Sequence, residues 1–534
     1  MTALLRQRAR RDRVQLAVWV LCTGLLAFVT ANAVGTTYGD TEERVGIMRL
    51  AVANPSILLL RGLPQGTSLP AFVFFQIFTY LALLAALMST FLAVRHSRAE
   101  EESGRAELIS ATPAGRIRPT VATIVHGVLA NLVLGVAVTL GLVTGGMPVD
   151  GSLVAGLATT AVGVAFLAVG LLAAQFAHTS RGANSISVAL VLLAFLLRGV
   201  GDARGTPSAD GLRITSAWPS WLSPIGWAQH VGAFTANDPT PLLLCAGLAL
   251  LCGGAVFALQ SRRDSGASLL PGVAGRADAR PWLRGPFSLA WRLQWPTIVA
   301  WCVGGALFGL VAGALSGVVV QAAEENPDLA STLQTLVPGK GTVTQVLISA
   351  MFGLVGFVAA ACAAQGVIRA RQEEAGGTAE LLLATPLGRV RWLACYLLLG
   401  LVAIGLVLLS AALASTGAVF ASGDDEAHIG ESFAAAAAQI PAALCYLGVL
   451  ALVFVLVPSI TAALGWTLLG AGVFLGTFGG LIDLPRWARD LSPFTHTPVV
   501  LSAEADLSGA AWLVVVAVAA ASVALVVMRR RQLH

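Results

Sequence analysis

Long apolar segments alternate with short polar ones along the whole chain. Most of the apolar segments hold about 20 residues, the length that a helix needs to cross a bilayer. They lie at residues 14–34, 71–94, 120–144, 152–177, 185–200, 240–260, 296–320, 344–367, 392–416, 433–457, 459–481 and 509–528. This pattern predicts an all-α polytopic membrane protein with about 12 transmembrane helices.

A basic segment precedes the first apolar one, with arginines at positions 6, 8, 10, 11 and 13. Ala31-Asn32-Ala33 would suit signal-peptide cleavage, but we favour an uncleaved first span because the segment is long enough to cross a bilayer. We expect the basic segment to form an interfacial helix on the cytoplasmic surface. Residues 35–70 are mixed in polarity and predict an external loop.

One polar stretch occurs twice. Residues 98–118 and 371–391 are identical at 13 of 21 positions, each match lying 273 positions after its partner. Because this offset is about half of the chain length, the repeat predicts two copies of one six-span unit. Residues 1–261 form the first, residues 262–286 a cytoplasmic linker and residues 287–534 the second. The matches include Glu100/Glu373, Glu101/Glu374, Gly104/Gly377, Glu107/Glu380, Leu108/Leu381, Thr112/Thr385 and Pro113/Pro386.

The repeated stretch predicts a helix, a turn and a second helix. Glu100, Gly104 and Leu108 recur at helical spacing, which places them on one face of a short helix whose acidic side chains point outward. Thr112-Pro113 and Thr385-Pro386 then suit a helix start, because threonine is a good N-cap and proline is favoured at the first helical position.

A weaker repeat comes late in each unit. Leu222-Ser223-Pro224 and Leu491-Ser492-Pro493 both follow tryptophans and precede the last span of their unit. Tryptophan and proline at a span boundary predict short helices or re-entrant turns at the outer membrane interface, although aromatic anchoring alone would give the same pattern.

Composition agrees with a membrane protein. Of the 534 residues 56% are apolar and 11% are charged, and the mean hydropathy is +0.80. Most arginines lie in the N-terminal segment, the two repeats, the linker and the C-terminus, so the positive-inside rule predicts cytoplasmic termini. The seven cysteines lie in apolar segments without metal-ligand spacing, so we expect no metal site. The expected surroundings are a lipid bilayer, with no nucleic-acid partner.

The pattern R-x-E-E-x-x-G-x-x-E-L-x-x-A-T-P-x-G-R, between the second and third spans of each unit, resembles the cytoplasmic loop of ABC-2 type transport permeases. The fused form resembles permeases of bacterial exporters for polyketide antibiotics, the tetronasin-resistance type. This resemblance implies two ABC-2-like halves in a bacterial plasma membrane, which export hydrophobic small molecules of the antibiotic or multidrug type. It also implies that each repeat is a coupling helix that docks on an ATPase subunit.

The chain lacks the residues that such transport needs for ATP hydrolysis. It has no G-x-x-x-x-G-K-[ST] phosphate loop, and its only lysine, Lys340, follows Pro338-Gly339 without the required earlier glycine. We therefore expect a permease and not an enzyme, with ATP and Mg²⁺ on a separate partner. Two coupling helices imply two copies of that ATPase subunit.

The resemblance also implies how the repeats act. ATP binding closes the ATPase subunits, which press on both coupling helices; Leu108 and Leu381 fill an apolar groove, and Gly104 and Gly377 permit close backbone approach. The alternative is that these charges only solvate a cytoplasmic loop, which the occurrence of two copies makes less favoured. The carboxylates expected to pair with basic side chains of the ATPase are Glu100, Glu101, Glu107, Glu373, Glu374 and Glu380.

The substrate path has one candidate in the sequence. Phe74, Phe75 and Phe78 share a face of the second span and could line an apolar drug cavity, as the resemblance suggests. A stripe of this kind also faces lipid or packs against a neighbouring helix.

Two rival classes of protein have weaker support. A twelve-span secondary transporter also has two six-span halves, but ionisable residues within the spans are almost absent here. Arg198 and Asp202 are four residues apart and could form a local pair, and Asp483 lies beyond the eleventh span. A membrane-embedded enzyme is disfavoured because the seven histidines show no His-x-x-x-His or Glu-x-x-His pairing.

Overall fold

The computed structural model describes the chain except for residues 1, 112–114, 116, 263–277, 279–280, 284, 326–342, 422–428, 479–484, 499–506 and 532–534. Twelve helices among the described residues are long and apolar enough to cross a membrane, which confirms the predicted polytopic all-α class. The chain divides into two compact units, Met1–Gly275 and Arg276–His534, and the division falls within the range predicted as a linker. Most of that linker, Lys340 and Asp483 lie outside the described residues.

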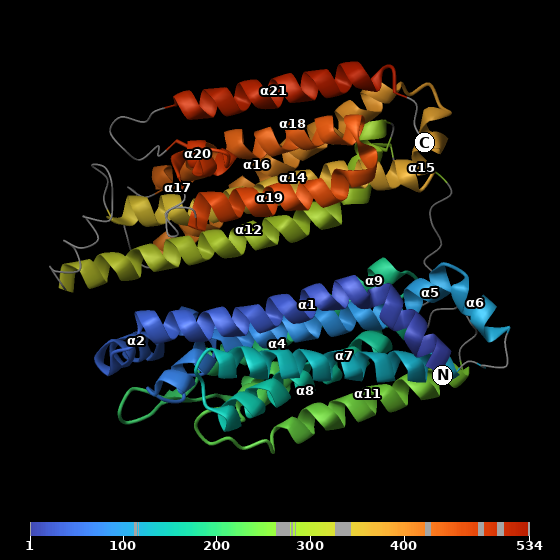
Figure 1. Cartoon of the computed structure of the whole chain (residues 1–534). Helices are drawn as coiled ribbons and strands as arrows, with labels where there is room; N and C mark the ends of the chain where they lie inside the picture. Colours follow the sequence, from blue (N-terminus) through green and yellow to red (C-terminus); the bar gives the residue numbers. More distant parts are fainter. Residues whose placement is uncertain are drawn as a thin grey trace. The chain divides into compact units, whose positions relative to one another are not determined.

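The first unit contains six of the candidate spans and several short elements (Figure 1). Its elements are α1 (Thr2–Thr37), α2 (Thr41–Ala53), α3 (Pro55–Arg61), α4 (Leu69–Arg95), α5 (Arg98–Glu102), α6 (Arg105–Ser110), α7 (Ile117–Thr144), α8 (Val149–Phe176), α9 (Ser180–Ala203), β1 (Thr206–Pro207), β2 (Ile214–Thr215), η1 (Trp218–Leu222), α10 (Pro224–Gln229) and α11 (Leu242–Arg262). The two short strands form an antiparallel pair.

The second unit contains the other six candidate spans. Its described elements are α12 (Pro286–Glu325), α14 (Val343–Ala375), α15 (Thr378–Leu383), α16 (Arg389–Ala421), α17 (Ile429–Ala438), α18 (Ile440–Leu456), η3 (Pro458–Ile460), α19 (Thr461–Phe478), α20 (Arg486–Arg489), η4 (Pro493–His496) and α21 (Ser508–Met528).

One prediction for the N-terminal region is wrong. The basic segment is part of α1, and its Arg8 and Asp12 are buried, so it forms no separate interfacial helix. The segment continues the span because no proline interrupts it and both buried charges have partners within the unit. Residues 35–70 contain α2 and α3, where Asp40 caps α2 by accepting the Glu42 N–H at 3.2 Å.

Small residues allow the helices to pack closely. In α12, Cβ atoms at Gly309 and Gly313 would lie 2.1 Å from the Ala411 carbonyl oxygen and 2.3 Å from that of Ser415. In the first unit, Ser89 of α4 and Asn131 of α7 exchange hydrogen bonds of 2.8 and 3.1 Å. Backbone approach at small residues and polar bonds between helices are the interactions that associate helices in lipid.

The weaker sequence repeat forms the same cap in both units. Ser223 precedes α10, where its Oγ accepts the Gly226 N–H and donates to the carbonyl of Ala194 at 2.7 Å. Ser492 precedes η4, where its Oγ accepts the Phe494 N–H and donates to the carbonyl of Gly472 at 2.7 Å. The prediction of short helices is confirmed, and each serine also fastens its short helix to a long one.

The predicted pair of Arg198 and Asp202 forms in the interior of the first unit. Arg198 Nη1 lies 3.3 Å from Asp202 Oδ2, and both side chains are 0% exposed. Arg198 also donates to the carbonyls of Leu58 and Leu59, at 3.2 and 2.7 Å. Gln229 donates to both Asp202 oxygens, so the pair joins α9 to α3 and α10.

We expect Asp202→Ala to lower the free energy of unfolding by about 3–5 kcal/mol, because it leaves the Arg198 guanidinium buried without its counter-charge. The loss should appear as a lower melting temperature of the detergent-purified protein. Asp210→Ala, which removes an exposed carboxylate from the neighbouring loop, is the control and should cost less than about 1 kcal/mol. Equal melting temperatures for the two variants would contradict the assignment of a buried ion pair.

Candidate functional site

Each repeat contains a sharp turn where a continuous helix was predicted. In the first, α5 ends and α6 begins on either side of Gly104, whose φ is +71°. In the second, Gly377 separates α14 from α15 with a φ of +73°. The prediction of one helix with glycine on its face is wrong, because these φ values lie in the left-handed region that glycine readily adopts. We call residues 98–110 and 371–383 the repeat segments.

The acidic pair of each repeat segment points inward. Glu100 is 9% exposed, and Glu373 and Glu374 are 4% and 5% exposed. The prediction that these carboxylates point outward is therefore wrong. They are buried because a basic side chain lies one helical turn before each of them and pairs with it within the same unit.

These pairs follow the same spacing in both copies. His96 and Arg369 occupy equivalent positions four residues before Glu100 and Glu373, at 3.3 and 3.5 Å. The next pair has a spacing of three residues: Arg98 lies 2.7 Å from Glu101, and Arg371 lies 3.2 Å from Glu374. In the first unit the His96–Glu100 pair joins α5 to the end of α4, whereas in the second unit all four paired residues lie within the last turns of α14.

A leucine and the glutamate before it stay exposed in each repeat segment. Leu108 is 73% exposed and Leu381, its equivalent, is 74% exposed. Glu107 and Glu380 precede them and are also exposed. The repeat segments therefore present an apolar side chain beside a carboxylate at the same position in each unit.

The predicted helix start at Thr385-Pro386 is wrong. Helix α16 begins at Arg389, and Thr385 lies in the turn after α15, where its hydroxyl donates to the Leu382 carbonyl at 2.5 Å. The threonine bonds back to the preceding helix, so it does not cap the following one. The corresponding Thr112 and Pro113 lie outside the described residues.

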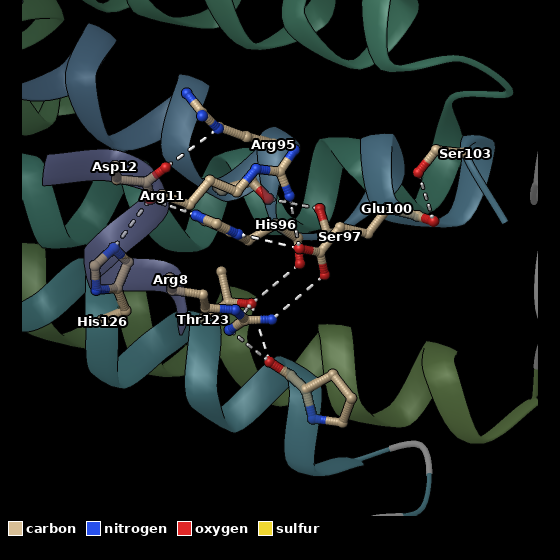
Figure 2. Close-up of polar contacts among 12 residues, drawn as sticks. Arg8, Arg11, Asp12, Arg95, His96, Ser97, Glu100, Ser103, Thr123 and His126 are labelled. Atoms are coloured by element: carbon tan, nitrogen blue, oxygen red, sulfur yellow. Dashed lines mark hydrogen bonds and ion pairs between the residues drawn. The ribbon is translucent and has the colours of Figure 1, made fainter. Parts of the chain in front are cut away.

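A charged cluster surrounds the first repeat segment (Figure 2). Glu100 is contacted by Arg8 at 3.6 Å, by Arg11 at 3.4 Å and by His96 at 3.3 Å. Arg8 also donates to the Pro119 carbonyl and to Thr123 Oγ1, at 2.9 and 2.8 Å. The N-terminal part of α1 is thereby joined to both α5 and α7.

Asp12 forms the second half of this cluster. Its Oδ2 lies 2.5 Å from His96 Nε2 and 3.1 Å from His126 Nε2, and its Oδ1 lies 3.2 Å from Arg95 Nε. Among the described residues, Asp12, His96 and His126 offer possible metal-ligand atoms that lie within 4.8 Å of one another. Two ligands of one zinc ion stand about 3.3 Å apart for metal–ligand lengths near 2.0 Å. His96 Nε2 and Asp12 Oδ2 lie closer than two ligands of one zinc ion would, and Arg95 already supplies Asp12 with a counter-charge.

The second repeat segment is contacted by the C-terminal residues. Arg531 Nη2 lies 2.5 Å from Glu374 Oε1, and its guanidinium lies 4.9 Å from the centre of the Phe454 ring. Arg389 donates to the Arg531 carbonyl at 2.7 Å. Sequence analysis missed these roles of Arg8, Asp12 and Arg531, because only the arginine-rich composition of the chain ends signalled them.

The predicted phenylalanine stripe packs within the first unit. Phe74, Phe75 and Phe78 are at most 5% exposed, and the rings of Phe74 and Phe78 stack with centroids 4.6 Å apart. Phe234 contacts Phe74 edge to face. Their role in a substrate path stays a prediction, and the contacts agree with the alternative that the stripe packs against neighbouring elements.

A separate cavity of about 440 Å³ lies in the second unit. Its walls are apolar apart from Tyr446, whose hydroxyl donates to the Leu468 carbonyl at 3.2 Å. A Cβ at Gly472 would lie 1.8 Å from this hydroxyl, so the absence of a side chain there leaves room for the tyrosine. The lining residues are Ala364, Cys445, Tyr446, Val449, Leu450, Gly465, Leu468, Ala471, Gly472, Leu475, Leu491 and Pro493.

Comparison with known proteins gives two matches. The family model described as "Multidrug efflux system permease Rv1217c, C-terminal domain" matches residues 283–529. The multidrug efflux system permease protein Rv1217c of Mycobacterium tuberculosis is 32% identical over 534 residues, which cover 99% of this chain and 95% of the relative.

We expect Gly104→Ala to strain the turn of the first repeat segment by about 1–2 kcal/mol, because a Cβ disfavours its positive φ although no heavy atom lies within 4 Å. Opening of the segment should become about 5–30-fold more frequent. The measurement is the rate of trypsin cleavage after Arg105 in detergent. Gly405→Ala, also in open space but within α16, is the matched control and should leave this rate unchanged.

Proposed function

Because the chain belongs to the family of the multidrug efflux system permease Rv1217c, we propose that it is the transmembrane permease of an ATP-driven ABC-2 type exporter. It would move hydrophobic small molecules of the antibiotic or multidrug type out of a bacterial cell, from the plasma membrane in which its helices lie. The twelve candidate spans and the relative's description as a permease support this proposal.

The exposed leucines carry the coupling part of the proposal. Leu108 and Leu381 occupy equivalent positions in the two repeat segments, and they are 73% and 74% exposed. An apolar residue repeated in this way, beside Glu107 or Glu380, suits a pocket with a basic rim on two copies of one partner. We propose that this partner is the ATPase subunit, which also binds ATP and Mg²⁺.

The buried ion pairs give this surface its mechanical role. The His96–Glu100 pair joins α5 to the end of α4, and Glu373 and Glu374 lie in the last turns of α14 itself, so a force on Leu108 or Leu381 acts on those long helices. Closure of the two ATPase subunits would then tilt helices within both units. The turn at Gly104 or Gly377 directs the leucine away from the buried acidic pair.

The cavity in the second unit supports the proposed class of substrate. It is large enough for a drug-sized molecule, and its apolar walls would accept hydrophobic compounds of varied shape. Tyr446 supplies one hydroxyl at its wall, which suits orientation of a ligand more than strict selection.

We expect the double variant Leu108→Asp/Leu381→Asp to lose its ATPase partner, because it places a charge in each apolar contact. Loss of a buried apolar anchor costs at least about 2 kcal/mol per site, so each site should bind more than tenfold more weakly. The measurement is recovery of a Walker-motif ATPase, expected at about two copies per chain, with the tagged protein in mild detergent.

Leu222→Asp/Leu491→Asp is the matched control for this experiment. These leucines are also exposed and also repeated, but they precede α10 and η4 at the other ends of their units. The control should retain the ATPase. If no ATPase is recovered with the unaltered chain even after cross-linking, the coupling proposal fails, and dependence of transport on an ion gradient should be measured instead.

We expect Ala471→Trp to reduce drug export several-fold, because the indole would fill the cavity whose wall Ala471 forms. ATPase recovery should stay unchanged. The measurement is accumulation of a fluorescent hydrophobic drug in cells that express each variant. Ala462→Trp adds the same side chain to an exposed site of α19 outside the cavity lining and should export normally.

A further inference from the structure

Both ends of the chain contact a repeat segment of their own unit. Arg8 and Arg11, in the first turns of α1, lie against Glu100 of the first segment. Arg531, which follows the last helix, lies against Glu374 of the second. In Figure 1 the N label lies near the end of the first unit that bears α5 and α6, and the C label lies near α15.

The N-terminal contact is buried and has several partners. The Arg8 side chain is 4% exposed and reaches Glu100 from one side while donating to Pro119 and Thr123 of the α7 region on the other. The guanidinium is hydrogen-bonded to α7 and ion-paired with Glu100, so its rigid planar geometry restricts the separation of the two elements. Arg8 therefore connects the first repeat segment to the start of α7.

The C-terminal contact has the same character. The Arg531 side chain is 11% exposed and lies between the Glu374 carboxylate and the Phe454 ring of α18. Arg389, at the first residue of α16, donates to the Arg531 carbonyl. Arg531 therefore connects the second repeat segment to α18 and to the start of α16, the helix that corresponds to α7 by the repeat offset.

The helices that carry these arginines are held in place by other contacts. In the middle of α1, a Cβ at Gly141 of α7 would lie 2.4 Å from the Gly24 carbonyl oxygen. In the same way, a Cβ at Gly448 of α18 would lie only 2.5 Å from the Ala517 carbonyl oxygen of α21, so these two helices pack closely. Neutralising Arg8 or Arg531 therefore removes that arginine's own contact with the repeat segment and leaves the packing of the long helix.

We propose that the two chain ends act as clamps on the repeat segments, with Arg8 and Arg531 as positioning residues for coupling. Each arginine fixes its segment to the helix that follows it in the chain, so that force on the exposed leucine reaches two long helices of the unit instead of one. The coupling role of these arginines rests on the proposed function. Their role in holding the repeat segments in place does not depend on it.

The first measurement is amide hydrogen exchange in the full-length protein purified in detergent. Arg8→Gln should speed exchange of residues 98–110 about tenfold and leave residues 371–383 unchanged, and Arg531→Gln should do the reverse. Arg10→Gln and Arg530→Gln are the matched controls, because these exposed arginines lie within two residues of the clamps and carry the same charge. Exchange that is unaltered in both clamp variants would overturn the proposal.

The second measurement tests positioning against a merely structural role. In vesicles that contain the chain and its co-purified ATPase, we expect Arg8→Gln and Arg531→Gln to lower the drug transported per ATP hydrolysed about tenfold, with ATPase recovery unchanged. Arg531→Lys, which keeps the charge, should restore part of the ratio. Normal transport per ATP in variants with faster exchange would overturn the coupling role.

Failure of the proposed function gives a different result. If the unaltered chain yields no ATPase, the proposed function fails, while the exchange measurement still decides whether the chain ends hold the segments. If the ATPase is recovered and the clamp variants lose it, Arg8 and Arg531 act in docking and the positioning role is overturned.

Discussion

The structure depends on the cost of burying charge at the end of an apolar helix bundle. An unpaired carboxylate or guanidinium is expensive in such a place, so a charge buried there requires a partner in the same unit. Both repeat segments meet this requirement by the same rule, with a basic side chain four residues before the first glutamate and an arginine three residues before the second. Because the acidic pairs are occupied internally, the exposed surface that the two segments share includes a leucine and the glutamate before it.

The sequence predicted the spans and the repeat because both depend on local pattern. Length and hydropathy identify a membrane helix without knowledge of its neighbours, and an identity of 13 positions in 21 is visible without a structure. The position of each exposed leucine relative to the acidic side chains depends on the backbone at Gly104 or Gly377, which glycine leaves undetermined in the sequence. The three- and four-residue spacings from Arg98 to Glu101 and from His96 to Glu100 were the signal that pointed to internal pairing.

The remaining contacts join residues far apart in the chain. Arg11 and Glu100 are 89 positions apart, and Arg531 and Glu374 are 157 positions apart. Periodicity carries no information on such pairs, and arginines at a chain end are also explained by the positive-inside rule. The same limit applies to His96 and His126, which lie on different helices and show no metal-binding spacing, yet both contact Asp12. The cavity beside Tyr446 likewise arises from the packing of α18 and α19, which the sequence pattern of each helix alone does not specify.

The two units expose equivalent leucines but hold their repeat segments in place with different residues. The first places His96 where the second has Arg369, and one draws its extra cations from the N-terminus and the other from the C-terminus. Leu108 and Leu381 nevertheless have almost equal exposure. Two identical partner subunits would therefore meet matching contacts, while the paths from those contacts into the helices differ between the units.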